Sequence, residues 1–369
     1  MNIVLVLHKY SVSIDDPCCY PLGFMYISAV LKQQGHAVSV LNYNLRDYDF
    51  VSEVRRADAV LFTGFEEFLS YIKRDALICR NLGIKTILGG ALATFKPDEM
   101  SQFVDVVVTG EGECVVSKAL CSEGIVTGLR PSINDLPFPD YEGFGISEYH
   151  KRHTFRYMGV ITSRGCPHTC RFCAQTCSYQ QRNLSSVFEE IDHYKATYGV
   201  THIVFNDNTL NLNKVRFLAI CAGMKLRGLA WGAAIRVDVF DDEMARAAKE
   251  SGCWYFIVGV ESFNDDKLSA MNKRVTADQI RSTLDLLHKY GIEYHGNVLV
   301  GLPDESQQDI LNELRSLPLQ YNIFPVLVQP FVGTQYQNRG INNDEANRLS
   351  SFFKEYAESK GKVMYREAA

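Results

Sequence analysis

Short, nearly continuous apolar runs alternate with amphipathic stretches along this chain of 369 residues. Such runs, bounded by turn residues, are typical of strands buried on both faces of a parallel sheet. In the first third of the chain they are 3–7, 38–41, 59–63, 86–88 and 104–108. The intervening stretches 22–34 and 68–82 each precede a glycine, Gly35 and Gly83, of the kind that ends a helix. We therefore predict a five-stranded, doubly wound (Rossmann-like) α/β domain over residues 1–127, with ligands bound beyond the carboxyl ends of its strands.

The pattern breaks at residues 128–150, where three prolines, Pro131, Pro137 and Pro139, exclude both helix and sheet, so we predict a linker. Alternation then resumes with a longer period. The predicted strands are 157–162, 202–206, 231–235, 254–260, 294–300 and 324–329. The predicted helices are 185–198, 213–227, 241–251, 276–290 and 306–317, with Asp241 and Thr276 as N-caps and Gly252 and Gly291 as stops. Six such units predict a partial (βα)6 barrel over residues 151–340, followed by a closing helix at 343–360 and a tail within residues 341–369.

Composition bounds the class of protein. A hydrophobic content of 46% and a charged content of 22% are typical of a globular protein, and the net charge of −5 gives no general attraction to nucleic acid. The amino terminus lacks a basic region and a signal-length apolar run, and no stretch approaches membrane-spanning length. The eleven cysteines are one cluster plus scattered single residues, which favours a reducing compartment. We expect a cytoplasmic protein with no membrane or nucleic-acid partner.

Three cysteines lie close together directly after the first predicted barrel strand. Cys166, Cys170 and Cys173 are separated by three and then two residues, and Phe172 precedes the last of them. Three thiolates can hold a four-iron cluster and leave one iron open to a small molecule. The alternatives are a structural zinc site, with Cys177 or His168 as fourth ligand, and a disulfide pair.

This cysteine spacing resembles that of the radical S-adenosylmethionine (radical SAM) enzymes. The resemblance implies that Cys166, Cys170 and Cys173 bind a [4Fe-4S] cluster, whose open iron chelates the methionine end of SAM. It further implies that the reduced cluster cleaves SAM to a 5′-deoxyadenosyl radical, with a flavodoxin- or ferredoxin-type protein as reductant. Each barrel strand is also followed by polar or glycine residues that would face the same opening.

SAM lying across this opening needs acceptors for its ammonium and ribose, a cation for its carboxylate and an apolar shelf for adenine. Asp207 and Glu261 are the predicted acceptors, and Arg236 is predicted to pair with the carboxylate or with Glu261. The candidates for the adenine site are Phe172, Leu299, Gly301 and Phe331. Each of these could alternatively be an ordinary solvated residue at a strand end.

Several segments resemble one subgroup, the radical SAM enzymes with an amino-terminal cobalamin-binding domain. They include 21–27, 88–91, 108–113 and the linker motif 136–139. A corrinoid against the sheet needs close approach of the backbone, which glycines at strand ends permit. The candidate cobalamin contacts are Leu22, Gly23, Gly64, Gly89, Gly90, Gly110, Glu111 and Gly112; ordinary βα turns are the alternative explanation of the glycines. No Asp-x-His-x-x-Gly motif supplies a histidine ligand in this domain.

The resulting hypothesis is methyl transfer from methylcobalamin to a carbon of a small-molecule substrate in biosynthesis. A second hypothesis keeps the radical chemistry without methyl transfer, as ring contraction, cyclisation, oxidation or bond cleavage, with or without cobalamin. A methylthiotransferase is less favoured, because Cys18, Cys19, Cys79, Cys114 and Cys121 do not form a second three-cysteine motif. A non-catalytic redox protein would not require polar residues at successive strand ends.

Overall fold

The computed structural model describes residues 1–10, 20–174, 177–302, 305–306, 308–309, 312, 321–328 and 334–336. The chain divides into two compact units. The first comprises Met1–Gly159 with Thr197–Gly199, and the second comprises Val160–Ala196 and the chain from Val200 onward. The domain boundaries expected from the sequence stay predictions.

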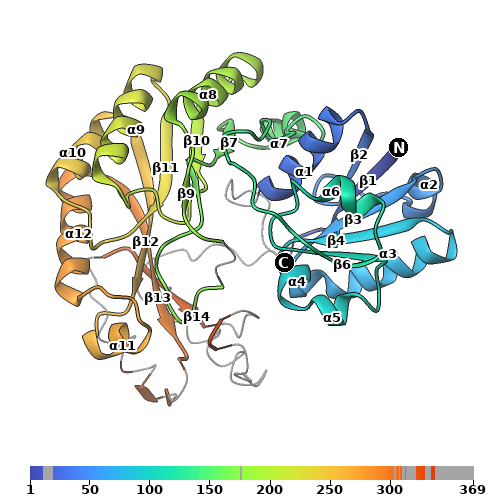
Figure 1. Cartoon of the computed structure of the whole chain (residues 1–369). Helices are drawn as coiled ribbons and strands as arrows, with labels where there is room; N and C mark the ends of the chain where they lie inside the picture. Colours follow the sequence, from blue (N-terminus) through green and yellow to red (C-terminus); the bar gives the residue numbers. More distant parts are fainter. Residues whose placement is uncertain are drawn as a thin grey trace. The chain divides into compact units, whose positions relative to one another are not determined.

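The first unit is built on a parallel sheet of six strands in the order β2-β1-β3-β4-β5-β6 (Figure 1). The strands are β1 (Asn2–Leu7), β2 (Ala37–Asn42), β3 (Ala59–Thr63), β4 (Lys85–Gly89), β5 (Val106–Thr109) and β6 (Gly124–Thr127). The prediction of five strands was therefore wrong by one. The missed strand, β6, has only four residues and lies at the sheet edge, and three of the four are exposed. It lacks the buried apolar run by which the other five were found.

Helices cover both faces of this sheet. They are α1 (Leu22–Gln33), α2 (Phe50–Val54), the short 3-10 helix η2 (Glu66–Phe68), α3 (Leu69–Asn81), α4 (Ala91–Phe95), α5 (Pro97–Met100), α6 (Val116–Leu120) and α7 (Ile146–Arg152). Val4 and Val6 of β1 share a core with Ile72 of α3, and the alternate residues Ile3 and Leu5 are equally buried. Because both sets of side chains are covered, the sheet is the buried parallel type that the apolar runs predict.

The second sheet also has six parallel strands, in the order β14-β13-β12-β11-β10-β7. The strands are β7 (Tyr157–Val160), β10 (His202–Phe205), β11 (Ala230–Ile235), β12 (Cys253–Glu261), β13 (Glu293–Val300) and β14 (Ile323–Leu327). The helices are α8 (Leu184–Tyr198), α9 (Lys214–Arg227), α10 (Asp242–Glu250), α11 (Asp265–Ala270) and α12 (Ala277–Tyr290). Among the described residues β7 and β14 do not pair, so the sheet is an open, partial (βα)6 barrel as predicted.

Helices α9, α10 and α12 lie along one side of the second sheet (Figure 1). Trp231 and Phe256 are fully buried and contact Phe217 of α9 and the neighbouring Phe240. The predicted N-caps are confirmed: Asp241 accepts from the Met244 N–H, and Thr276 forms a capping box with Gln279. Gly291 ends α12 in the left-handed conformation, as predicted.

Besides β6, the sequence analysis missed the short elements α2, η2, α4, α5, α6 and α7 of the first unit. The expectation that residues 128–150 exclude helix was wrong at its end, because α7 begins at Ile146, after the last of the three prolines. In the second unit three small elements were missed. Helix α11 has six residues, and strands β8 (Ser163–Arg164) and β9 (Gln180–Gln181) have two each. Most of the predicted helix 306–317, and all of the predicted helix 343–360, lie outside the described residues. Within the part of the chain that is described, no helix is both long and apolar enough to cross a membrane.

Candidate active site

The cysteine loop begins and ends at two short strands that pair with each other and form the neck of the loop. Ser163 pairs with Gln181 and Arg164 with Gln180 in an antiparallel ladder, so the two ends of the loop lie side by side. Gly165 follows at a φ of +74°, and a Cβ atom there would lie 2.3 Å from the Ser178 carbonyl oxygen and 2.5 Å from that of Cys177. Only glycine fits this close backbone contact. The sequence Gly165-Cys166 therefore starts a loop that is closed at its base.

The three predicted ligands lie on this loop. None of Cys166, Cys170 and Cys173 is in a disulfide; the first two are half-buried and the third is exposed. Desolvation and the nearby Cys170 and Cys166 sulfurs raise the pKa of the Cys173 thiol, which places the three sulfurs in one electrostatic neighbourhood. Three such soft donors, reduced and grouped on one loop, fit an iron-sulfur cluster. No three described His, Cys, Asp or Glu side chains converge on a single metal ion, but a four-iron cluster does not require this, because each thiolate binds a different iron.

The tip of the cysteine loop contacts the turn that follows α11. The Asn272 side-chain amide donates to the Thr169 carbonyl oxygen at 2.8 Å and to its hydroxyl at 2.9 Å, and the Arg171 N–H donates to the Met271 carbonyl oxygen. Asn272 and Arg274 both have positive φ angles, which side chains other than glycine adopt at a cost. The turn is thus held in an unusual conformation beside the cysteines.

Lys273, between those two residues, is the functional candidate that the sequence analysis missed. Its ammonium donates to Oε1 of Glu261 at 2.7 Å, and the two residues are 5% and 6% exposed. The Lys273 ammonium also lies 5.7 Å from the centre of the Phe172 ring. Gly259 provides the room for this pair, because a Cβ atom there would lie 2.6 Å from Nζ of Lys273 and 2.7 Å from the Glu261 carboxylate.

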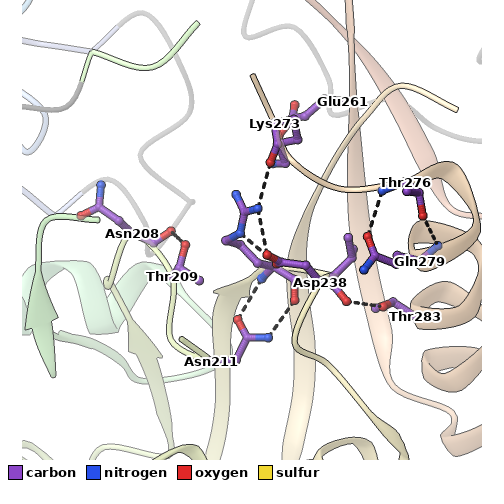
Figure 2. A network of polar contacts seen from close by, with 11 residues as sticks. Asn208, Thr209, Asn211, Asp238, Glu261, Lys273, Thr276, Gln279 and Thr283 are labelled. Carbon is purple, nitrogen blue, oxygen red and sulfur yellow. Dashed lines mark hydrogen bonds and ion pairs between the residues drawn. The ribbon is translucent and has the colours of Figure 1, made fainter. Parts of the chain in front are cut away.

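The predicted pairing of Arg236 with Glu261 is wrong. Arg236 forms a fork with Asp238, at 2.9 and 3.2 Å, and donates to the Lys273 carbonyl oxygen at 3.0 Å. Its backbone exchanges two hydrogen bonds with the side chain of Asn211 (Figure 2). Glu261 instead follows a register shift at the end of β12, at a φ of 63°, and this turns its carboxylate toward Lys273. The guanidinium therefore holds the turn at Lys273 in place.

Asp207 lies directly beyond the end of β10 and is 4% exposed. One carboxylate oxygen accepts the Thr162 N–H at 2.6 Å, and the other accepts the hydroxyls of Thr162 and Ser163 at 2.7 and 2.6 Å. Burial raises the pKa of this carboxyl, and the bonds to Ser163 and Thr162 oppose the rise. These contacts give Asp207 a different task from the SAM contact predicted for it, since its carboxylate binds the root of the cysteine loop.

The remaining candidates for the adenine site lie at separate positions. Leu299 is buried near the end of β13, and Gly301 follows that strand at a φ of 76°. Phe172 is half-buried on the cysteine loop. Phe331 lies outside the described residues. Their common role stays a prediction.

The candidate cobalamin residues of the first unit fall into two groups. At Gly23, Gly89 and Gly110 no atom of the described residues lies within 4 Å of where a Cβ would be, so these residues leave the backbone open at these strand-end and helix-start positions. Gly110 has a φ of +73°, and its N–H donates to the Thr94 hydroxyl. This open backbone at the ends of β4 and β5 fits the close approach of a flat macrocycle.

In the second group, contacts with other residues of the chain explain why these residues are present. A Cβ at Gly64 would lie 2.5 Å from the Phe68 ring, one at Gly90 would lie 2.6 Å from the Thr63 hydroxyl, and one at Gly112 would lie 3.2 Å from Ile27. Glu111 lies 3.8 Å from Arg130, and Leu22 is buried in the first turn of α1. Packing within the chain accounts for these residues without a ligand.

Comparisons with known proteins decide the family. Residues 160–317 match the Radical SAM superfamily, and residues 16–120 match the B12 binding domain. The chain belongs to the radical SAM enzymes that carry a B12-binding domain. This membership confirms the predicted fold class and the predicted cofactors, which are a [4Fe-4S] cluster, SAM and cobalamin.

Individual relatives of this radical SAM enzyme are distant. An uncharacterized methyltransferase of Pyrococcus horikoshii is 28% identical, over 88% of this chain and 79% of that protein. The anaerobic magnesium-protoporphyrin IX monomethyl ester cyclase of Cereibacter sphaeroides is 28% identical, over 61% of this chain but only 43% of its own length. The methyltransferase TsrM of Kitasatospora setae, solved with cobalamin and a [4Fe-4S] cluster bound, superimposes with a TM-score of 0.73 over 91% of this chain and 77% of TsrM, at 18% identity. At that identity the superposition shows the shared fold.

Proposed function

We propose that this protein is a cobalamin-dependent radical SAM methyltransferase that methylates a carbon atom of a small molecule in a biosynthetic pathway. The observation that carries the proposal is the presence of a B12-binding and a radical SAM domain in one chain. The methyltransferase names of the Pyrococcus relative and of TsrM support it. The cluster would supply the electron that cleaves SAM, and cobalamin would carry the methyl group.

We assign the cluster to Cys166, Cys170 and Cys173 and the methionine end of SAM to the Lys273–Glu261 pair. The methionine end is a zwitterion, and a buried ammonium beside a buried carboxylate matches it charge for charge. Lys273 would then pair with the SAM carboxylate and Glu261 with the SAM ammonium. Each of the two residues would thus replace its present partner with a group of SAM of the same charge. Lys273 replaces Arg236 as the predicted cation, because the guanidinium of Arg236 is already bonded to Asp238 and to the Lys273 carbonyl.

Gly23, Gly89 and Gly110 are the proposed points of backbone approach to cobalamin.

We further propose a flavodoxin- or ferredoxin-type electron donor and a cytoplasmic location. The grouped, disulfide-free cysteines support the latter, since a cluster of this kind needs a reducing environment.

A second candidate function is radical chemistry without methyl transfer, which the similarity to a cyclase favours. The two candidates differ in what they make from SAM. Methyl donation leaves S-adenosylhomocysteine, whereas radical cleavage leaves 5′-deoxyadenosine. The test is to incubate the anaerobically reconstituted protein with cobalamin, SAM and a chemical reductant, and to quantify both products by mass spectrometry. We expect both; 5′-deoxyadenosine alone, from protein that holds cobalamin, would favour the second candidate.

A further inference from the structure

The root of the cysteine loop, residues 161–163, is held by charged side chains from three other parts of the second unit. Asp207 comes from the end of β10, Arg216 from the first turn of α9, and Arg182 from the segment after β9. Together they bind the three polar atoms of Thr162, the Ser163 hydroxyl and the Ile161 carbonyl oxygen.

Thr162 shows the arrangement most clearly. Its N–H and its hydroxyl donate to Asp207, while its carbonyl oxygen accepts from the Arg216 guanidinium at 2.9 Å and from the Arg182 N–H at 2.8 Å. Every polar atom of Thr162 is thus bonded to one of these three residues. Its position cannot shift without breaking a bond to a charged side chain.

Asp207, Arg216 and Arg182 together form what we call the clamp, and its two arginines are held by further contacts. Arg216 also donates to the Arg182 carbonyl oxygen at 2.7 Å. The Arg182 guanidinium pairs with Glu190, which is fully buried and accepts in turn from the Tyr194 hydroxyl at 2.7 Å. The anchoring therefore runs from the root of the loop into the packed core under α8.

Asp207 carries its charge at a cost. Burying a carboxylate is unfavourable unless its lone pairs are satisfied, and within the described residues it is satisfied by two hydroxyls and one N–H, with no cation at ion-pair distance. A neutral side chain could pack here more cheaply. What the carboxylate adds is three strong acceptor contacts on two successive residues, three and four positions before Cys166.

We propose that Asp207 is a positioning residue for the cluster, acting through Thr162 and Ser163, and that Arg216 supports it from the opposite side. The clamp sets where Cys166 starts relative to the Lys273–Glu261 pair and so sets how SAM meets the cluster. The inference rests on the family's cluster and SAM, and is independent of whether the enzyme transfers a methyl group.

The test is Asp207→Asn, which keeps one acceptor oxygen but replaces the other with an amide nitrogen that cannot accept the two hydroxyl bonds. We expect iron content within about 20% of wild type, because all three cysteines remain. SAM affinity should fall about tenfold, because the cluster would no longer be held in register with the Lys273–Glu261 pair. The change that SAM causes in the electron paramagnetic resonance spectrum of the reduced cluster should be smaller or absent. In the apoprotein, the Thr162 amide should exchange with deuterium faster.

Ser163→Ala removes the hydrogen bond from the Ser163 hydroxyl to Asp207 by deleting its donor. If Asp207 acts through this bond, the double variant should be little worse than Asp207→Asn alone. Asp105→Asn is the matched control, because Asp105 makes the same pair of bonds to Thr86, at 2.8 Å to its N–H and 2.7 Å to its hydroxyl, in the first unit.

Wild-type SAM affinity and spectrum in Asp207→Asn would overturn the proposal. So would loss of iron in step with thermal unfolding in both Asp207→Asn and Ser163→Ala, since that would make the clamp a purely structural device.

Discussion

Single residues decide what the cysteine loop can bind. Gly165 allows the loop to close, and the side chains that follow it are three thiols in one electrostatic neighbourhood. The cysteine spacing was sufficient to predict that the three thiols lie on one loop, because they fall within eight residues of one another in the sequence; their role as cluster ligands stays a prediction.

Replacing Cys166, Cys170 and Cys173 together by alanine should abolish cluster binding, since no thiolate remains on the loop to hold iron. Iron analysis and visible absorbance after anaerobic reconstitution measure this directly. Cys121→Ala, at an exposed cysteine of the first unit, is the control and should keep its iron. Full iron in the triple variant would show that the cluster is held elsewhere.

Lys273 is the residue that the sequence could not reveal. It lies twelve positions after Glu261 in an Asn-Lys-Arg stretch that is typical of an exposed turn. It is buried because Asn272 and Arg274 adopt positive φ angles and because Gly259 leaves space above the sheet. These are properties of backbone conformation and of pairing across β12, which residue types alone do not encode. Of the two partners predicted for Arg236, the structure contradicts Glu261, because the guanidinium is bonded to Asp238 two residues further on.

Lys273→Met should weaken SAM binding by about 10- to 100-fold, because it removes a charged donor while keeping the side-chain volume. Equilibrium binding of SAM to the reconstituted protein measures the effect. Lys267→Met is the matched control, since Lys267 also pairs with a carboxylate, that of Glu305, in the same unit. An equal loss in the two variants would argue against a specific role for Lys273.

Gly259→Ala tests the Lys273–Glu261 pair by filling the space that Gly259 leaves for it. The added methyl group would collide with both the Lys273 ammonium and the Glu261 carboxylate and force them apart. SAM binding should weaken to a similar extent while the cluster is retained. Unchanged SAM affinity would mean that the pair is not the receptor for the methionine end.

At the scale of elements, the sequence predicted what periodicity and caps encode. Every long buried strand and every long helix of the described residues lies within a few residues of its predicted position. The elements missed all have seven residues or fewer, which is too short to show a clear helical or strand period; they are α2, η2, α4, α5, α6, α7 and α11 and the strands β6, β8 and β9. Yet β8 and β9 form the neck of the cysteine loop, and α11 leads into the turn that carries Lys273.

Helix α12 starts directly after that turn, so its cap should stabilise both. Thr276→Ala should lower the free energy of unfolding by about 1 kcal/mol, because the N-cap bond to the Gln279 N–H is lost. Gln279→Ala removes only the return bond of the capping box and should cost about half as much. Urea denaturation of the two variants separates these values, and equal costs would contradict the assigned roles.

At the scale of the whole molecule, the chain joins a sheet that holds a corrinoid to a partial barrel that holds a cluster. Regular βα alternation predicted both architectures. The sequence could not tell at which strand-end glycines the described residues leave open space and which glycines face the protein's own side chains. That distinction depends on neighbours distant in sequence, such as Phe68 over Gly64.

Two glycine variants of the first unit should therefore behave differently. Gly64→Ala should destabilise the fold by about 1 to 3 kcal/mol, because its methyl group meets the Phe68 ring. Gly89→Ala should leave stability unchanged but weaken cobalamin binding at least about fivefold, since among the described residues no atom lies close to its methyl group at the end of β4. Thermal denaturation and a cobalamin titration measure the two effects. The reverse pattern would contradict the assignment of these strand ends.

The central claim is that one chain holds the cluster and cobalamin together and uses the former to cleave SAM. The most direct measurement combines metal analysis with product analysis on protein produced with ample cobalamin and reconstituted without oxygen. The account predicts about four irons and about one cobalt per chain, with 5′-deoxyadenosine formed from SAM after reduction. Protein that folds, carries its cluster and cleaves SAM, yet neither copurifies with cobalamin nor binds it when it is added, would contradict the account.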